Sequence, residues 1–78
     1  MTAVVFVLIN VELGSEREAL KELRSIPNVK EVHLTYGAYD VIAKVEGENQ
    51  DEVKDTVTNR IRTLPNIRST FTMVVVED

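Results

Sequence analysis

The 78-residue sequence contains no cysteine and a single histidine, His33. The lack of cysteine excludes disulfides and thiolate metal sites, and one histidine cannot build a zinc site alone. We therefore predict no metal and no cofactor. A chain this short buries only roughly 60% of the surface that its unfolded form exposes. Without disulfides or metals, the remaining source of extra stability is association with other subunits.

Clusters of basic residues and long apolar runs are also lacking. Nine Lys and Arg residues against 13 Asp and Glu residues give a net charge of −4, and the basic residues are scattered. Nucleic-acid binding requires clustered basic residues, so we expect no direct nucleic-acid partner. No run is long enough for a transmembrane helix, and the apolar start lacks the features of a signal peptide. We expect a soluble cytoplasmic protein with no membrane partner.

The sequence does contain strongly alternating and helical patterns. Residues 2–12 predict a strand that is apolar in both registers, and such a strand must be covered on both faces. Residues 67–77 predict a last strand of the same kind. The two apolar registers of the first strand are Val4, Phe6 and Leu8, and Val5, Val7, Ile9 and Val11.

Two segments, about 16–25 and about 50–63, have helical spacing of their apolar residues. Each begins with a capping-box pattern, in which two side chains satisfy free amides of the first turn. Each ends near a proline, which cannot continue a helix. The capping pairs are Ser15 with Glu18 and Asn49 with Glu52, and the prolines are Pro27 and Pro65.

A β-hairpin is predicted in the middle of the chain. Residues 29–36 and 39–45 alternate in polarity on either side of Gly37, for which we expect a positive φ. A two-residue turn would place Tyr36 opposite Tyr39 as a cross-strand aromatic pair.

The element order β-α-β-β-α-β predicts a single α+β domain over residues 1–78. The expected fold is ferredoxin-like, a four-stranded antiparallel sheet with two helices on one face. Its first strand is central, so one apolar register of that strand would point away from the helices. An exposed apolar patch of this size marks a partner surface, and we expect a homodimer or a higher oligomer of dimers. The pattern leaves open which register faces the interface.

The segment Val29–Val45 resembles the C-terminal effector-binding (RAM) domain of the leucine-responsive regulatory protein/AsnC family. In that family, a strand followed by Gly-x-Tyr-Asp and an apolar strand is characteristic, and Thr70–Val76 is similar to the last strand. The resemblance implies dimers that assemble into octameric or other rings and bind small effectors, typically amino acids, near this turn. The ligand-binding residues that it implies are Tyr36, Gly37, Tyr39 and Asp40, with Thr70 and Thr72 as weaker candidates.

The usual members of the family begin with a helix-turn-helix DNA-binding domain, whereas the first strand here begins at residue 2. We therefore expect a stand-alone effector domain that acts on full-length relatives through mixed assembly. In its functional interpretation, Asp40 meets the amino group of a bound amino acid, while amides near Gly37 take the carboxylate. In the alternative interpretation, Asp40 only helps the hairpin to close.

No catalytic residues are predicted. His33 has no accompanying nucleophile or paired carboxylates and is expected at a surface or an interface. The favoured function is a non-enzymatic regulatory module that binds an amino acid. The alternatives are a cofactor-free dimeric enzyme of monooxygenase or isomerase type, with a cleft between sheet and helices, and a structural ring adaptor. The sequence leaves the ligand and the oligomer number open.

Overall fold

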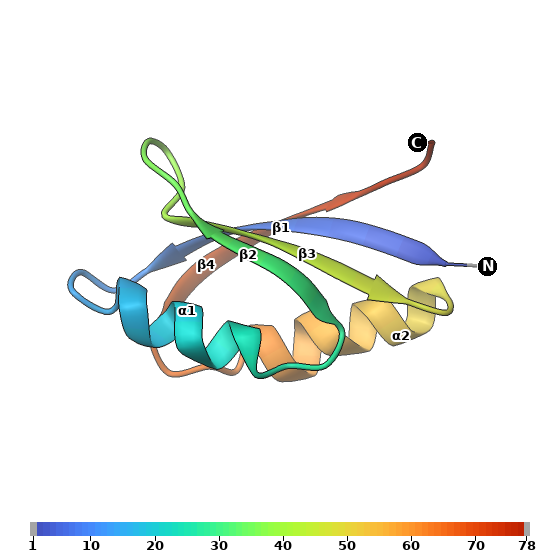
Figure 1. Cartoon of the computed structure of the whole chain (residues 1–78), viewed down its shortest axis with the longest axis horizontal. Coiled ribbons are helices and arrows are strands. Elements are labelled where there is room, and N and C mark those ends of the chain that lie inside the picture. The colour runs from blue at the N-terminus through green and yellow to red at the C-terminus, as the bar shows by residue number, and fades with distance from the viewer. Residues whose placement is uncertain (1, 78) are drawn as a thin grey trace.

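The computed structural model describes residues 2–77 and confirms the ferredoxin-like α+β fold (Figure 1). The four strands form one antiparallel sheet in the order β2-β3-β1-β4, with the helices on one of its faces. The elements are β1 (Ala3–Val11), α1 (Glu16–Arg24), β2 (Val29–Leu34), β3 (Val41–Gly47), α2 (Gln50–Asp55), the π-helix η1 (Thr56–Ile61) and β4 (Ile67–Val74).

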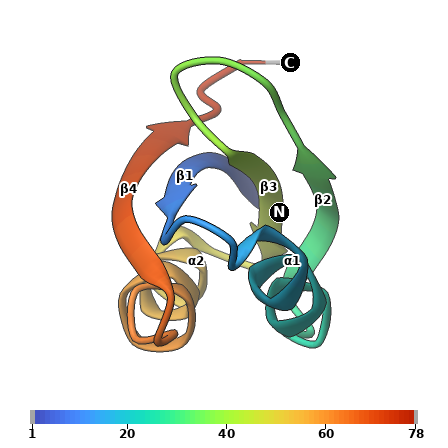
Figure 2. The same ribbon diagram turned by 90° about the vertical axis from the view of Figure 1, so that its left-hand side faces the viewer.

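The core lies between the sheet and the helices. The odd-numbered residues of β1 face the helices, and all of them are buried. Figure 2 shows α1 below the β2 side of the sheet and α2 below the β4 side. The largest fully buried side chains are Val7, Ile9, Leu23, Val41, Val45, Val53 and Ile61.

The even-numbered residues of β1 lie on the opposite face, which no helix covers. The register that the sequence left open is therefore the even-numbered one, which points away from the helices. Leu8 is paired with Ile42 on one side and Phe71 on the other, and Phe6 is paired with Met73. We call the apolar residues of this face the open-face patch. Its members are Val4, Phe6, Leu8, Ile42, Phe71 and Met73.

The two predicted helix caps differ in outcome. At the start of α2, Asn49 Oδ1 accepts a hydrogen bond from the backbone N–H of Glu52 at 2.8 Å, as predicted. The carboxylate of Glu52 accepts from the N–H of Glu48 instead of from Asn49. The capping box predicted at Ser15 is wrong, because the Ser15 side chain makes no cap hydrogen bond. Its φ of −103° and ψ of 11° lie outside the extended region that positions a capping side chain, whereas Asn49 is extended.

The second helix changes its winding halfway along. After α2, the segment Thr56–Ile61 is a π-helix, and the backbone N–H of Arg62 donates to the carbonyl of Val57, five residues earlier. The predicted α-helix over 50–63 was therefore right in position but wrong in its second half. π-helical turns are rare and occur frequently at functional sites.

Candidate functional site

A six-residue loop, 35–40, replaces the predicted two-residue turn of the hairpin. β2 ends at Leu34, and beyond it the N–H of Thr35 still donates to the carbonyl of Asp40 at 2.9 Å. The Thr35 hydroxyl donates to the carbonyl of Tyr39 at 2.7 Å. The predicted register therefore continues for one further pair, after which the chain leaves the ladder. The loop rises from the sheet on the side opposite the helices (Figure 1).

The two tyrosines of the loop occupy different environments. Tyr36 is fully exposed, whereas the Tyr39 ring lies 6.5 Å from the ring of Phe71 on the open-face patch. The predicted Tyr36–Tyr39 pair is therefore wrong, because the ladder ends before it reaches them. Gly37 has a φ of +143°, so its predicted positive φ is confirmed. A Cβ there would meet no atom within 4 Å, so the backbone conformation alone favours glycine.

Asp40 fastens the loop to β1. Its Oδ2 accepts a hydrogen bond from the N–H of Val11 at 2.9 Å, and its own N–H donates to the carbonyl of Ile9 at 3.0 Å. The pairing of β1 with β4 shifts register between Asn10 and Val11, so the end of this strand is irregular. Asp40 thus has a structural role, in line with the alternative interpretation, that uses one of its two carboxylate oxygens.

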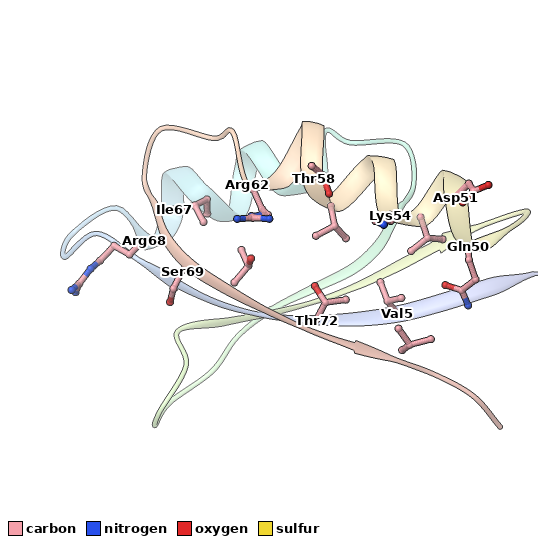
Figure 3. A pocket seen from close by; sticks show the side chains of 14 residues that line it. Val5, Gln50, Asp51, Lys54, Thr58, Arg62, Ile67, Arg68, Ser69 and Thr72 are labelled. Atoms are coloured by element: carbon pink, nitrogen blue, oxygen red, sulfur yellow. The ribbon is translucent and has the colours of Figure 1, made fainter.

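Thr70 and Thr72 lie on the other face of the sheet, where they are paired with Ile9 and Val7 of the helix-facing register. They line a groove between β4 and the second helix (Figure 3). The structure therefore brings Tyr36, Gly37, Tyr39 and Asp40 together in the loop and separates the two threonines from them.

The groove has a volume of about 880 Å³. It exists because α2 packs on the central strands β1 and β3 and leaves the helix side of the edge strand β4 uncovered. Its apolar lining includes Val5, Val53, Val57, Ile67 and Val74, and its polar lining includes Lys54, Thr58, Arg62, Arg68, Ser69, Thr70 and Thr72. The groove was not predicted from the sequence. Its only sign there is that threonines alternate with apolar residues in β4, which gives this strand a polar face on the helix side.

Charged residues lie beside the open-face patch, on β2 and β3. Glu31 accepts from His33 Nε2 at 3.2 Å, and Lys44 Nζ lies 3.6 Å from Glu31 and 3.4 Å from Glu46. The hydrogen bond from His33, followed by the charge of Lys44, lowers the pKa of Glu31. The hydrogen bond and charge of Glu46, followed by Glu31, raise the pKa of Lys44. His33 is exposed, as expected, and lies outside the groove where the enzyme alternative would place its chemistry.

Two further properties concern the described residues, 2–77. In that range, no three His, Cys, Asp or Glu side chains are grouped so that they could hold a metal ion. None of its helices has both the length and the apolar character needed to cross a membrane.

Comparison with known proteins gives consistent matches. The family described as the Lrp/AsnC ligand binding domain matches residues 4–78. An HTH-type transcriptional regulator of Pyrococcus horikoshii is 35% identical over 72 residues, which cover 88% of this chain and 48% of that protein. The chain thus spans about half the length of the curated relatives that it matches.

Solved structures share the fold over nearly the whole chain. A hypothetical protein from Pyrococcus horikoshii is 36% identical, with a TM-score of 0.90 over 100% of this chain and 93% of its own. AsnC of Escherichia coli is 28% identical, with a TM-score of 0.91 over 97% of this chain and 52% of its own. A Neisseria meningitidis regulator, solved as a complex with L-Met, shares the fold at 13% identity and a TM-score of 0.86. The chain belongs to the Lrp/AsnC family of transcriptional regulators and corresponds to their ligand-binding domain.

Proposed function

We propose that this domain is a non-enzymatic regulatory module that binds an amino acid at the 35–40 loop and acts as an oligomer. The observation that carries the proposal is the position of the loop. It stands at the border of the uncovered open-face patch, with Tyr39 against Phe71. The family match to a ligand-binding domain supports a small-molecule effector, and the L-Met complex of the Neisseria regulator supports an amino acid.

The open-face patch supports association. Phe71 is 61% exposed and Met73 is 48% exposed, although both lie beside the apolar residues of β1. A contiguous apolar surface bordered by charged residues is typical of a protein interface, and here Glu31, Lys44 and Glu46 form the border. A homodimer packed through this face would place the 35–40 loop at a subunit boundary. Dimers of this kind are the units from which a higher oligomer would form.

The loop offers complementary groups to a zwitterion. The Asp40 carboxylate suits the ammonium group of an amino acid, and the backbone amides near Gly37 suit its carboxylate. The exposed hydroxyl of Tyr36 supplies a third polar contact. Ligand binding at a subunit boundary would change the assembly, and mixed assembly with DNA-binding relatives would transmit that change without direct DNA contact by this domain.

Titration calorimetry against the standard amino acids tests the proposal. In Asp40→Asn, the amide oxygen still accepts from the Val11 N–H while the charge is removed. We expect this variant to fold normally and to bind roughly tenfold more weakly, because a charge-assisted hydrogen bond is lost. Glu18→Gln, on the exposed side of α1, is the matched control. Unchanged affinity in Asp40→Asn would remove Asp40 from the site, and no binding of any amino acid would overturn the proposed effector class.

A further inference from the structure

The groove between β4 and the second helix has the dimensions of a ligand site. Small-molecule sites measure about 300–1,000 Å³ and combine apolar walls with a few polar groups. The groove, at about 880 Å³, falls in this range. It lies on the helix side of the sheet, whereas the 35–40 loop rises on the opposite side (Figure 1). It is therefore separate from the loop to which the proposed function assigns the amino acid.

The groove concentrates positive charge on an acidic protein. Lys54, Arg62 and Arg68 line it, three of the nine Lys and Arg residues in a chain of net charge −4. The ion pairs found within residues 2–77 use only Lys44 and His33 as their cationic partners. Arg68 also lines a small pocket with Asp40, whereas Lys54 and Arg62 have no carboxylate partner in that part of the chain and create a local field that attracts anions.

Two of these three cations, Lys54 and Arg62, face the groove, whereas Arg68 points away from it (Figure 3). Figure 3 shows Arg62 and Lys54 between the helix and β4, with Thr72 on the opposite wall. Asp51, the only acidic residue of the lining, points away from β4. Gln50 points toward the sheet (Figure 3), so the inward-facing polar groups are cations, hydroxyls and one neutral amide, a set that suits an organic anion better than an ammonium group.

The π-helix contributes to the same wall. Thr58 lies within η1 and Arg62 directly follows it, and both line the groove. Thr58 and Arg62 are four residues apart and therefore lie on the same side of the helix, facing β4. π-helical turns occur frequently at functional sites, and this one adds an observation independent of the charge.

We propose that the groove is a second ligand site that takes a small organic acid with a branched aliphatic chain and a 2-oxo group. Arg62 binds the carboxylate and Lys54 adds positive charge further along the groove (Figure 3). The Thr72 hydroxyl donates to the oxo oxygen, and the partly exposed side chains of Ile67 and Val74 contact the aliphatic chain. The corresponding amino acid binds here more weakly, because its ammonium group would face the cations. The two sites thus have different ligands: the loop binds the amino acid, and the groove binds the corresponding 2-oxo acid.

NMR titration of the ¹⁵N-labelled chain with 4-methyl-2-oxopentanoate and, separately, with L-leucine tests this assignment. These probes share an aliphatic chain and differ in the oxo or amino group. We expect the oxo acid to shift the amide signals of Thr58, Arg62 and Thr72, and to bind there at least roughly tenfold more tightly than L-leucine.

Variants then test the residues. Arg62→Gln is expected to weaken oxo-acid binding by roughly tenfold or more, because it removes the planar cation. Arg17→Gln, which makes the same change on the exposed side of α1, is expected to bind as the unmodified chain does. Thr72→Val keeps the shape of the side chain and is expected to weaken the oxo acid while leaving the weak L-leucine binding unchanged. Thermal unfolding of each variant establishes that it is folded.

Several outcomes would overturn the inference: signal shifts confined to 35–40, equal affinity of Arg62→Gln and Arg17→Gln, equal binding of both probes in the groove, or no shifts at saturating probe. Because amino-acid binding at the loop is read from different signals, the proposed function and this inference fail separately.

Discussion

The two faces of the sheet are built from the same kinds of apolar residue but differ in how far those residues are buried. On the helix-covered face, Val7 and Ile9 are completely buried by α1 and α2. On the other face, their neighbours Phe6 and Leu8 remain partly exposed, and Phe71 is 61% exposed. The difference lies in what covers them, because the apolar character of β1 is nearly equal on both sides. The covered face supplies the buried core of the domain, and the open face is the surface at which we propose that a partner binds.

Truncating two adjacent residues of β1, one on each face, tests most directly whether the two faces contribute differently to stability. Ile9→Ala removes a completely buried side chain and is expected to lower the free energy of unfolding by about 2–5 kcal/mol. Leu8→Ala, on the open face, is expected to cost about 1 kcal/mol in dilute solution. Urea unfolding at several protein concentrations measures both. The cost of Leu8→Ala should rise with concentration, because association stabilises the folded chain by mass action. Equal costs at every concentration would contradict the comparison.

A charge in the open-face patch tests whether that face is an interface. Phe71→Asp is expected to abolish association, because an unpaired carboxylate would be buried between subunits. The domain itself should remain folded, since Phe71 is largely exposed in the single chain. Multi-angle light scattering measures the mass, with Thr72→Asp as the control on the same strand but the opposite face. A Phe71→Asp protein of unchanged mass would show that subunits meet elsewhere.

The two helices that cover the buried face differ in how they begin, and this difference predicts a smaller effect. Asn49→Ala removes an observed cap hydrogen bond and is expected to cost about 1 kcal/mol. Ser15→Ala removes a side chain that makes no such bond and is expected to stay within about 0.5 kcal/mol. Thermal or urea unfolding of the two variants checks the contrast. A larger loss in Ser15→Ala would mean that its hydroxyl caps α1 in solution.

The smallest effect is expected from pH, at the charged border of the open face. The pKa of Glu31 is lowered in the fold, so its ionised form is favoured there. Its contribution is complete above the ordinary value of 4.5 and disappears as the pH falls through the lowered pKa. Glu31→Gln should therefore flatten the acid side of the stability curve, measured by urea unfolding at falling pH. An acid side identical to that of the unmodified chain would remove Glu31 from this role, and Glu18→Gln is the control.

The order of elements was predictable from the sequence because it depends on local alternation and spacing. The two-sided apolar pattern of β1 also predicted an uncovered face, although only the observed pairing identified which register lies there. Asn49 and Ser15 illustrate the limit of local patterns. Both head the same motif, yet only Asn49 has the extended backbone that brings its side chain over the first turn.

The sites were less predictable, because they depend on contacts between distant segments. Gly37 indicated a positive φ, but the length of the loop depends on where the ladder between β2 and β3 ends. The partner of Tyr39 is Phe71, which lies more than thirty residues further along the chain. The groove depends on how far α2 lies from β4, which no local pattern encodes. Thr70 and Thr72 were therefore selected with the loop residues but belong to a different surface.

The hydrogen bond between Asp40 and Val11 connects these surfaces. Val11, which donates to the Asp40 carboxylate, is paired with Ile67 at the start of β4, and Ile67 lines the groove. A ligand that draws this carboxylate toward itself at the proposed loop site would compete with the Val11 amide, whose residue is paired with the groove-lining Ile67. If the two proposed sites are coupled through this contact, occupation of the groove would change affinity at the loop by the same factor, because thermodynamic coupling is reciprocal. One hydrogen bond at the end of β1 would then link the proposed sites on the two sides of this small sheet.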